Sequence, residues 1–496
     1  MCGIVGYVGK RPVVDILVDG LEQLEYRGYD SSGVAVMCDS DIKVYKAIGK
    51  LQNLRDKLKD HVSEYSQSTI GIGHIRWATH GAPTLLNAHP HTCTCGNLVV
   101  VHNGIIENYK ELRDELSKDG CVFRSQTDTE AIAHLVARKY SECRDLTEAV
   151  RLASEEIEGA YALCVMHFDC KDKLVITKRN APLLVGAGEG EYFAASDVPA
   201  IIKHTKKAVY LNDNQIATLT PESLDIIDIE GNKITPKVEL LPWEPVALSK
   251  MGYKHFMLKE IHEQPDVIRN ILVGRLHAPD ENIILNEVKL NKDTLKKLNR
   301  IQIIACGTSL HAAMIGKYLI ESFCGIAVDV EASSEYIYRK TVTDEHTLVI
   351  GVSQSGETAD TLTAIKQAKA KGSHILIITN RPDSSMAREA DSLVPVNAGI
   401  EVSVAATKSY IAQLMAFYLL SLYMAEIKDS IASSTLTSLK SELMILPQKI
   451  EQILAHKENI QEVAKAYANT KDFIYIARGI NFATALEGAL KLKEIS

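Results

Sequence analysis

The chain has 496 residues, enough for several domains, and a formal net charge of -8. This acidic balance argues against nucleic acid or an anionic membrane as the main partner. No apolar run reaches the ~18 residues of a membrane-spanning helix, and no signal peptide precedes Cys2, so we expect a soluble, cytoplasmic protein. The ten cysteines follow no framework of spacings, which favours reduced thiols.

The first residues of the chain, MCGIVG, combine a nucleophile with a potential base. Removal of Met1 would leave Cys2 with a thiol and a free α-amino group on the same residue. Their ordinary pKa values, about 8.5 and about 8, allow the amine to accept the thiol proton near neutral pH. Residues 4–8 predict a buried strand that holds this end of the chain inside the fold. The alternative is an ordinary buried cysteine at the start of a strand.

Blocks of strands and helices follow through the first half of the chain. A helix is predicted at 13–24, with Gly28 as a stop signal, then strands at 33–37, 42–47, 70–78 and 98–101. A second helix is predicted at 108–118, ended by Gly120. A third is predicted at 131–140, where Thr127 to Glu130 have the spacing of a capping box. Further strands at 161–168, 174–177 and 192–194 complete a pattern that indicates an α+β unit.

The segment His102-Asn103-Gly104 follows an apolar strand, at a point where we expect a turn. When a thiolate attacks an amide carbon, an oxyanion forms and needs hydrogen-bond donors already in place. An asparagine amide beside an unhindered glycine N–H can supply them. The alternative is a simple Asn-Gly turn, which the dipeptide taken alone favours.

Five motifs occur in order along this half: MCGIVGYVG, LEYRGYDSSGVAV, GIGHIRWATHG, NAHPH and VVVHNGIIENY. In these motifs the chain resembles the N-terminal-nucleophile (Ntn) glutamine amidotransferases. The resemblance implies a four-layer αββα sandwich in which Cys2 is the nucleophile and its own α-amino group is the base. It also implies that Asn103 and Gly104 form the oxyanion hole, and that Arg27 has a supporting role near the nucleophile.

Such an enzyme must also hold the α-carboxylate and the α-amino group of glutamine. Arg76 is suited to the carboxylate and Asp128 to the ammonium group. A surface ion pair for Arg76 and a helix N-terminal acid for Asp128 are the alternatives. The resemblance places Trp77 in a loop that closes over glutamine and gates the passage of ammonia. It implies a glutamine pocket formed by Arg76, Thr79, His80, His89 and Asp128.

Two further patterns suggest ligands but have simpler explanations. His89, His91, Cys93 and Cys95 alternate, so a strand would place four possible metal ligands on one face. Pro90 interrupts that strand and no second ligand cluster is evident, so we expect no metal site. The glycine-rich segment 186–190 opens no helix, which favours a surface turn over a phosphate-binding loop.

From about residue 290 the pattern changes to strands followed by helices, which predicts an α/β unit with a parallel sheet. Two strand-to-helix corners carry hydroxyl groups: 301–305 leads into CGTS, and 347–352 leads into SQSGET. Hydroxyls and free N–H groups at helix N-termini bind anions, and ligands gather at the carboxyl ends of parallel strands. We therefore expect a phosphate ligand; capping turns without a ligand are the alternative. The absence of GxxxxGK[ST] disfavours a nucleoside triphosphate.

These corners resemble the sugar isomerase (SIS) fold, and the two halves together resemble the glutamine–fructose-6-phosphate aminotransferases. In EVSVAATKSY the chain has Ala406 where serine is common in that family. The resemblance implies L-glutamine and D-fructose 6-phosphate as substrates, no metal or organic cofactor, and a homodimer formed through the SIS half. It implies sugar-phosphate contacts from Thr308, Ser309, Ser353, Gln354, Ser355, Thr358, Val404 and Ala405.

Four segments are predicted: an amidotransferase domain at 2–240, a connector at 241–289, a first SIS domain at 290–455 and the beginning of a second at 456–496. Pro242 and Pro245 mark the first boundary, and 253–270 resembles the family's connector. The last segment repeats an earlier pattern, because a strand at 473–477 and a helix from Ala483 echo the first corner. In the family, Lys491 and Glu494 belong to the isomerase site, with Glu494 as base. The histidine-bearing loop and the lysine that should follow are missing, so we expect a truncated chain with an incomplete sugar half.

The sequence thus predicts an amidotransferase that makes D-glucosamine 6-phosphate, the first step of hexosamine synthesis; for the truncated chain, retention of only the glutaminase activity is the alternative outcome. Another Ntn amidotransferase is one alternative, which would require a diphosphate or ATP site in the second half. A sugar-phosphate-binding SIS regulatory protein is the other, which would require a DNA-binding module at the N-terminus. Neither feature is visible in the sequence.

Overall fold

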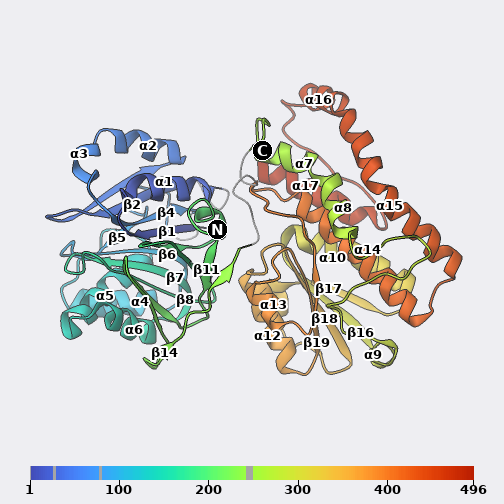
Figure 1. The fold of residues 1–496 in the computed structure, drawn as a ribbon, viewed down its shortest axis with the longest axis horizontal. Coiled ribbons are helices and arrows are strands. Elements are labelled where there is room, and N and C mark those ends of the chain that lie inside the picture. Colours follow the sequence, from blue (N-terminus) through green and yellow to red (C-terminus); the bar gives the residue numbers. More distant parts are fainter. Residues whose placement is uncertain (1, 26–29, 78–80, 242–249, 496) are drawn as a thin grey trace. The chain divides into compact units, whose positions relative to one another are not determined.

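The structure is a computed structural model that describes residues 2–25, 30–77, 81–241 and 250–495 (Figure 1). The chain forms two compact units, 1–249 and 250–496, which are treated separately. Arg27, Thr79, His80 and the prolines of the predicted boundary, Pro242 and Pro245, lie outside the described residues.

The first unit contains two antiparallel sheets. The eight-stranded sheet has the order β15 (Glu239–Leu240), β11 (Lys207–Tyr210), β9 (Leu184–Ala187), β10 (Tyr192–Ala195), β1 (Gly3–Val8), β4 (Ile70–Arg76), β2 (Ser31–Met37) and β3 (Ile42–Ile48). The seven-stranded sheet has the order β14 (Lys233–Ile234), β13 (Leu224–Ile227), β12 (Ile216–Leu219), β8 (Leu174–Arg179), β7 (Gly159–His167), β6 (Leu98–Ile106) and β5 (His91–Thr92).

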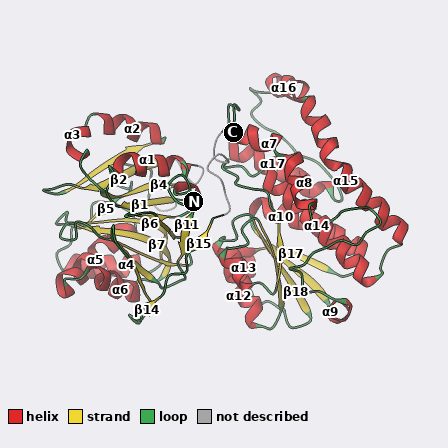
Figure 2. Cartoon of the chain, in the orientation of Figure 1, coloured by secondary structure: helices red, strands yellow, loops and turns green. Residues whose placement is uncertain are grey.

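Helices cover the outer faces of both sheets (Figure 2). One group comprises α1 (Val13–Glu22), α2 (Leu51–Lys59) and α3 (Val62–Tyr65), and the other α4 (Tyr109–Lys118), α5 (Thr129–Cys143) and α6 (Leu146–Glu156). Alternation along β6 explains the layering: Val99 and Val101 pack between the sheets, whereas Leu98 and Val100 pack beneath the second helical layer. The predicted αββα sandwich is confirmed.

Two local predictions for this unit are wrong. The strand predicted at 98–101 continues as β6 to Ile106, so His102-Asn103-Gly104 lies within a strand and not at a turn. The cause is β7, whose Gly159 still pairs with Ile106. The capping box at Thr127 and Glu130 does not form either, because Glu130 instead accepts hydrogen bonds from the backbone N–H groups of Arg124 (2.8 Å) and Ser125 (2.6 Å).

The second unit contains a five-stranded parallel sheet with the order β17 (Val328–Ala332), β16 (Arg300–Ala305), β18 (Thr347–Ser353), β19 (His374–Thr379) and β20 (Ser392–Pro395). Its described helices are α7 (Phe256–His262), α8 (Gln264–Leu272), α9 (Lys292–Lys297), α10 (Gly307–Cys324), α11 (Ser333–Tyr336), α12 (Ala359–Ala370), α13 (Ser385–Glu389), α14 (Lys408–Lys428), α15 (Ser433–Ala455), α16 (Lys457–Ala466) and α17 (Asn481–Ile495).

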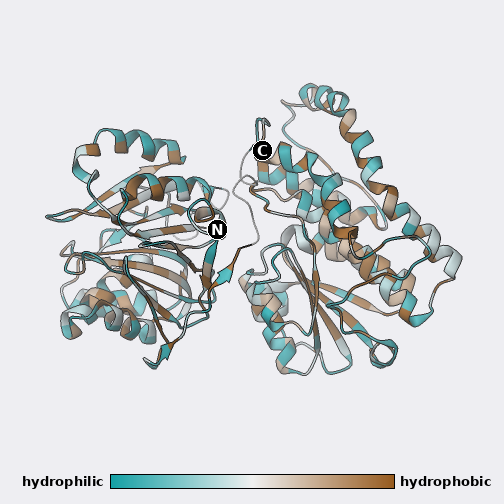
Figure 3. Cartoon of the chain, viewed as in Figure 1, coloured by the Kyte–Doolittle hydropathy of each residue, from teal (hydrophilic) through white to brown (hydrophobic). Residues whose placement is uncertain are grey.

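Both faces of the central strands β18 and β19 are buried, which explains why these strands are mostly apolar, whereas the edge strand β17 is largely exposed or half-buried (Figure 3). On β16, Ile303 packs in the cluster that includes α10 and α14, whereas Ile304 packs in the cluster that includes α12. The α14 helix is long and apolar enough to cross a membrane, but most of it is buried against α10 and α8. It is therefore a core helix, and the predicted SIS architecture is confirmed.

The strand predicted at 473–477 is not formed. Among the described residues no strand pairs with this segment, and Ile474 and Ile476 are each 89% exposed. An apolar parallel strand is stable only beside a partner strand, so the sequence pattern alone could not make it fold. The helix that follows does form, as α17, and packs on α10.

Candidate active site

Cys2 lies directly before β1, beside the end of β4. Because Gly3 pairs with Ile75 in the antiparallel ladder, the next residues of β4 and its loop lie alongside Cys2. The Trp77 backbone N–H donates to Cys2 Sγ at 3.4 Å, and the thiol lies 3.5 Å from the Trp77 carbonyl oxygen. Burial raises the pKa of the Cys2 thiol above its ordinary value, so the thiol is protonated at neutral pH and needs a base before it can attack.

Asn103 reaches Cys2 from the other sheet. Its Nδ2 donates to the Cys2 carbonyl oxygen at 3.2 Å. Gly104 follows with φ of 125°, where an added Cβ would lie only 2.0 Å from the Ala160 carbonyl oxygen. Only glycine fits at this position, so the backbone beside Asn103 stays unhindered. The structure thus brings the predicted nucleophile and the predicted oxyanion donors together.

The two residues predicted to hold the ends of glutamine lie at the end of β4 and at the start of α5. Arg76 ends β4 and is 4% exposed; its guanidinium donates to the carbonyl oxygens of Gly81 (3.2 Å) and Ala82 (3.4 Å). Asp128 is the N-cap residue of α5, and its carboxylate accepts the Ile106 N–H at 2.9 Å, three residues beyond Asn103. Trp77 is 45% exposed beside them.

Four buried histidines lie in contact near Asn103, and the rings of three of them form a histidine stack: His74 on β4, His89, and His91 on β5. The fourth, His102 on β6, donates its backbone N–H to His89 Nδ1 at 3.3 Å. The His74 and His89 rings are parallel with centroids 4.0 Å apart, and His91 meets His89 edge-on at 4.8 Å. Burial lowers the pKa of all four, that of His74 to about 3, so the rings are neutral at pH 7. The family resemblance implied His89 as a glutamine contact, whereas the sequence analysis did not single out His74.

The alternating residues considered as metal ligands separate into two groups. His89 and His91 belong to the histidine stack, whereas Cys93 and Cys95 place their Sγ atoms 3.0 Å from each other. Among the described residues, no group of three or more histidine, cysteine, aspartate or glutamate side chains could hold a metal ion.

The two hydroxyl-bearing corners of the second unit lie at one edge of its sheet. β16 and β18 are adjacent and parallel, with Ala305 paired to Val352, so both loops begin at the same level. Ser353 Oγ accepts the Gly356 N–H at 3.0 Å and lies 2.9 Å from Thr358 Oγ1; Ser355 Oγ accepts the Glu357 N–H at 3.2 Å. Hydroxyls held this way at the start of α12 suit a phosphate.

α17 brings charged groups to the first of these corners. Lys491 Nζ donates to Thr308 Oγ1 at 3.0 Å and to Glu494 at 2.5 Å, which joins three predicted site residues. The sequence analysis missed Glu487, which is buried and accepts from Thr308 Oγ1 (2.9 Å) and from His311 (2.7 Å). Burial opposes ionisation of Glu487, but the His311 hydrogen bond and the Lys491 charge hold its pKa below the usual range.

Other predicted sugar contacts lie on α10 and on the loop before α14. Ser309 Oγ accepts from Gln413 Nε2 at 3.0 Å, and the Gln354 carbonyl accepts the Asn380 N–H at 3.1 Å. Ala405 is buried and Val404 is exposed on a loop that Glu260 of α7 anchors. The buried Glu260 carboxylate accepts the N–H groups of Val402 and Ser403 and the Ser403 hydroxyl.

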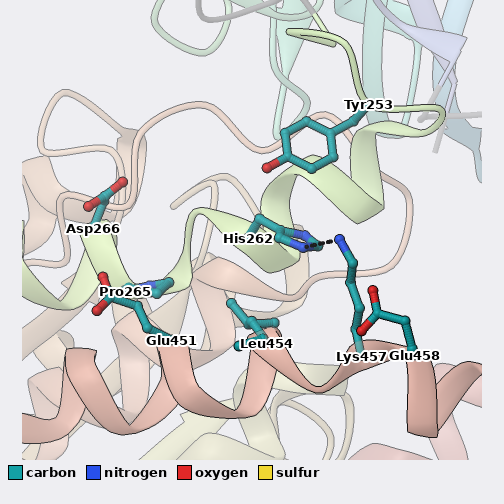
Figure 4. Close-up of a pocket in the computed structure, with 9 residues that line it drawn as sticks. Tyr253, His262, Pro265, Asp266, Glu451, Leu454, Lys457 and Glu458 are labelled. Atoms are coloured by element: carbon teal, nitrogen blue, oxygen red, sulfur yellow. Dashed lines mark hydrogen bonds between the residues drawn. The ribbon is translucent and has the colours of Figure 1, made fainter.

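A separate cavity of about 450 Å³ lies between α7 and α8 on one side and α15 and α16 on the other (Figure 4). Lys457 Nζ approaches His262 Nε2 within it at 3.5 Å. None of the predicted sugar-phosphate residues lines this cavity.

Comparisons with known proteins agree with the two units. The glutamine amidotransferase domain family matches residues 34–243 and the SIS domain family matches residues 294–423. A glutamine–fructose-6-phosphate aminotransferase [isomerizing] of Caldanaerobacter subterraneus subsp. tengcongensis is 47% identical over 496 residues, covering the whole chain and 81% of that protein. The protein of the same name from Gloeobacter violaceus is 49% identical over 497 residues, with the same coverage of both chains.

The chain belongs to the glutamine–fructose-6-phosphate aminotransferase family. Its second unit is also similar to the solved C-terminal domain of glucosamine-fructose-6-phosphate aminotransferase from Francisella tularensis, with 37% identity and a TM-score of 0.48 over 50% of this chain and 70% of that one. This aminotransferase chain spans 81% of the length of the relatives named above.

Proposed function

We propose that the chain transfers the amide nitrogen of L-glutamine to D-fructose 6-phosphate, yielding D-glucosamine 6-phosphate and L-glutamate. Family membership at 47% identity over the whole chain supports this reaction. The structural observation that carries it is the hydrogen bond from Asn103 Nδ2 to the Cys2 carbonyl oxygen, at 3.2 Å, which brings the Asn103 amide from the opposite sheet to the residue that bears the proposed nucleophile.

In the first unit, the proposed reaction begins with removal of Met1. The α-amino group of Cys2 takes the thiol proton, and the thiolate attacks the amide carbon of glutamine. The Nδ2 group of Asn103 and the N–H of Gly104 stabilise the tetrahedral oxyanion. The α-amino group returns the proton to the leaving ammonia, and water then hydrolyses the thioester to glutamate and the free thiol.

Glutamine is positioned by groups at both ends of its backbone. The guanidinium of Arg76 pairs with the α-carboxylate, and Asp128 pairs with the α-ammonium group. Trp77, Thr79, His80 and His89 complete the proposed pocket, with Trp77 closing over it. The raised pKa of Cys2 fits this scheme because the thiol stays protonated until the amine acts.

In the second unit, the phosphate of the sugar is proposed to bind the loops formed by Ser309, Ser353, Gln354, Ser355 and Thr358, with Val404 and Ala405 lining the pocket. Lys491 and Glu494 are proposed to serve the isomerisation, with Glu494 moving the proton between sugar carbons. The hydrogen bond from Lys491 to Thr308 supports this, because Thr308 belongs to the corner where the phosphate would lie and Lys491 also pairs with Glu494.

We also infer a cytoplasmic homodimer formed through the second unit. The net charge and the burial of α14 support a soluble protein, and the assembly rests on family resemblance alone. Sedimentation equilibrium of the purified chain tests the assembly: a mass twice that of one chain is expected, and a monomer at all concentrations would contradict it.

The function is tested by giving the purified chain glutamine labelled with ¹⁵N at the amide, together with fructose 6-phosphate. Labelled glucosamine 6-phosphate in equal yield with glutamate is the result expected of the complete reaction. Glutamate and free ammonia without amino sugar would confine this chain to the glutamine half. A reaction mixture in which no glutamate forms would contradict the proposal.

A further inference from the structure

The contacts of His74 connect the two sheets of the first unit at Asn103. His74 belongs to β4, and its Nε2 lies 3.0 Å from the His102 carbonyl oxygen and 3.0 Å from Asn103 Oδ1, both on β6. On its other side, the Asn103 amide contacts the carbonyl oxygen of Cys2 through Nδ2. A single imidazole thus contacts the backbone and the side chain beside the proposed oxyanion hole.

Two backbone carbonyls determine where the protons lie in this arrangement. The His102 carbonyl can only accept, so His74 Nε2 carries the hydrogen. A protonated Nε2 cannot accept, so the Asn103 atom that faces it is the oxygen. The amide nitrogen must then face Cys2, where the Cys2 carbonyl can again only accept. Both ends of the chain of hydrogen bonds therefore specify the same orientation of the amide.

The second ring nitrogen of His74, Nδ1, takes no part in these hydrogen bonds. Nδ1 is buried and has no hydrogen-bond partner among the described residues, and the ring is held by stacking on His89. Because burial keeps the imidazole neutral, the single ring proton stays on Nε2, where two oxygens compete for it.

We propose that His74 is a positioning residue for glutamine hydrolysis, whose Nε2–H holds the Asn103 amide so that its NH₂ group, and not its oxygen, faces Cys2. This inference rests on the proposed function of Asn103 as an oxyanion donor. Without His74, only the Cys2 carbonyl still favours this orientation, so the amide presents its oxygen to the developing oxyanion more often, which replaces attraction by repulsion.

The test uses substitutions that differ in where they place a donor. His74→Gln keeps an amide nitrogen at the position of Nε2, whereas His74→Asn places it at the position of Nδ1, and His74→Leu removes it. His167→Leu is the matched control, because His167 is also buried but pairs with Leu98 at the far end of the β6–β7 ladder. Each is measured for kcat and KM of glutamate release and for thermal unfolding.

We expect His74→Gln to keep kcat within about threefold of the original. His74→Leu and His74→Asn should lower kcat by at least about thirtyfold with little change in KM, since losing one oxyanion donor costs about a hundredfold or more. His167→Leu should lower the unfolding temperature but not kcat. Equal kcat for the Gln and Asn variants would overturn the proposal, and this comparison stands even if His74→Leu does not fold.

Asn103→Ala separates this inference from the function on which it rests. If Asn103→Ala retains full kcat, the oxyanion role of Asn103 fails, whatever His74 does. If Asn103→Ala lowers kcat, adding His74→Leu to it should cause less than a further twofold loss, because both changes remove the same interaction. A further loss as large as that of His74→Leu alone would show that His74 does not act through Asn103.

Discussion

Lowering the pH from 7 to 5 should destabilise the first unit, because the fold buries histidines in their neutral form. Burial lowers the pKa of His74 to about 3 and those of His89 and His91 well below the ordinary value of about 6.5. In the unfolded chain these rings take up protons below pH 6.5, whereas in the fold they do not. The unfolded state therefore binds more protons, and stability falls as the pH falls.

The magnitude follows from the size of the shift. Each histidine of this kind contributes its full stability above pH 6.5 and loses about 1.4 kcal/mol per pH unit below it, until its pKa in the fold is reached. For His74 the loss between pH 6.5 and pH 5 is about 2 kcal/mol. His89 and His91 add to this loss in the same direction, because burial also lowers their pKa values.

Urea unfolding at a series of pH values measures this slope. Trp77, which directly follows β4 in the first unit, provides a fluorescence signal for the unfolding of that unit. His91→Gln, which removes one ring that takes up a proton only on unfolding, should make the slope between pH 6.5 and pH 5 shallower. A free energy of unfolding that is the same at pH 5 and pH 7, within about 1 kcal/mol, would refute the reasoning.

Three further substitutions test other parts of the account. Gly104→Ala should lower the free energy of unfolding by at least about 3 kcal/mol in urea, because its Cβ would lie 2.0 Å from the Ala160 carbonyl; a loss under 1 kcal/mol would contradict the geometry. Arg76→Lys should raise the KM for glutamine about tenfold in glutaminase assays, since lysine cannot form the paired hydrogen bonds; an unchanged KM would remove Arg76 from the pocket. Glu260→Gln should weaken fructose 6-phosphate binding, measured by calorimetry, and lower the free energy of unfolding by about 1–2 kcal/mol, while glutamate release is unchanged. A variant that binds fructose 6-phosphate as tightly as the original would mean that the loop anchored by Glu260 does not contact the sugar.

The sequence predicted those parts of the fold that depend on local patterns. The apolar runs before CGTS and SQSGET were long enough to identify β16 and β18, and their parallel pairing then placed Thr308 and Ser353 at the same edge. Cys2 and Asn103 were predicted from chemistry and motif order, and in the structure the Asn103 amide donates a hydrogen bond to the backbone carbonyl of Cys2.

The features of the fold and the site that were missed depend on contacts between distant parts of the chain, which the spacing of residues along the sequence does not reveal. His74 acts on a residue 29 positions away, and Glu487 accepts from Thr308 across 179 positions. Glu130 fits a capping box by spacing, but burial against the 124–125 backbone gives its carboxylate other donors. In the same way, 473–477 has the composition of a strand but no described strand beside it.

The central claim is that Cys2 is the nucleophile that releases ammonia from glutamine. The most direct test is to measure glutamate release by the purified chain and by its Cys2→Ala variant, with tryptophan fluorescence confirming that both are folded. Loss of the nucleophile should reduce the rate by at least about a thousandfold, to the level of the reaction without enzyme. Glutamate release by Cys2→Ala within tenfold of the original rate would contradict the account.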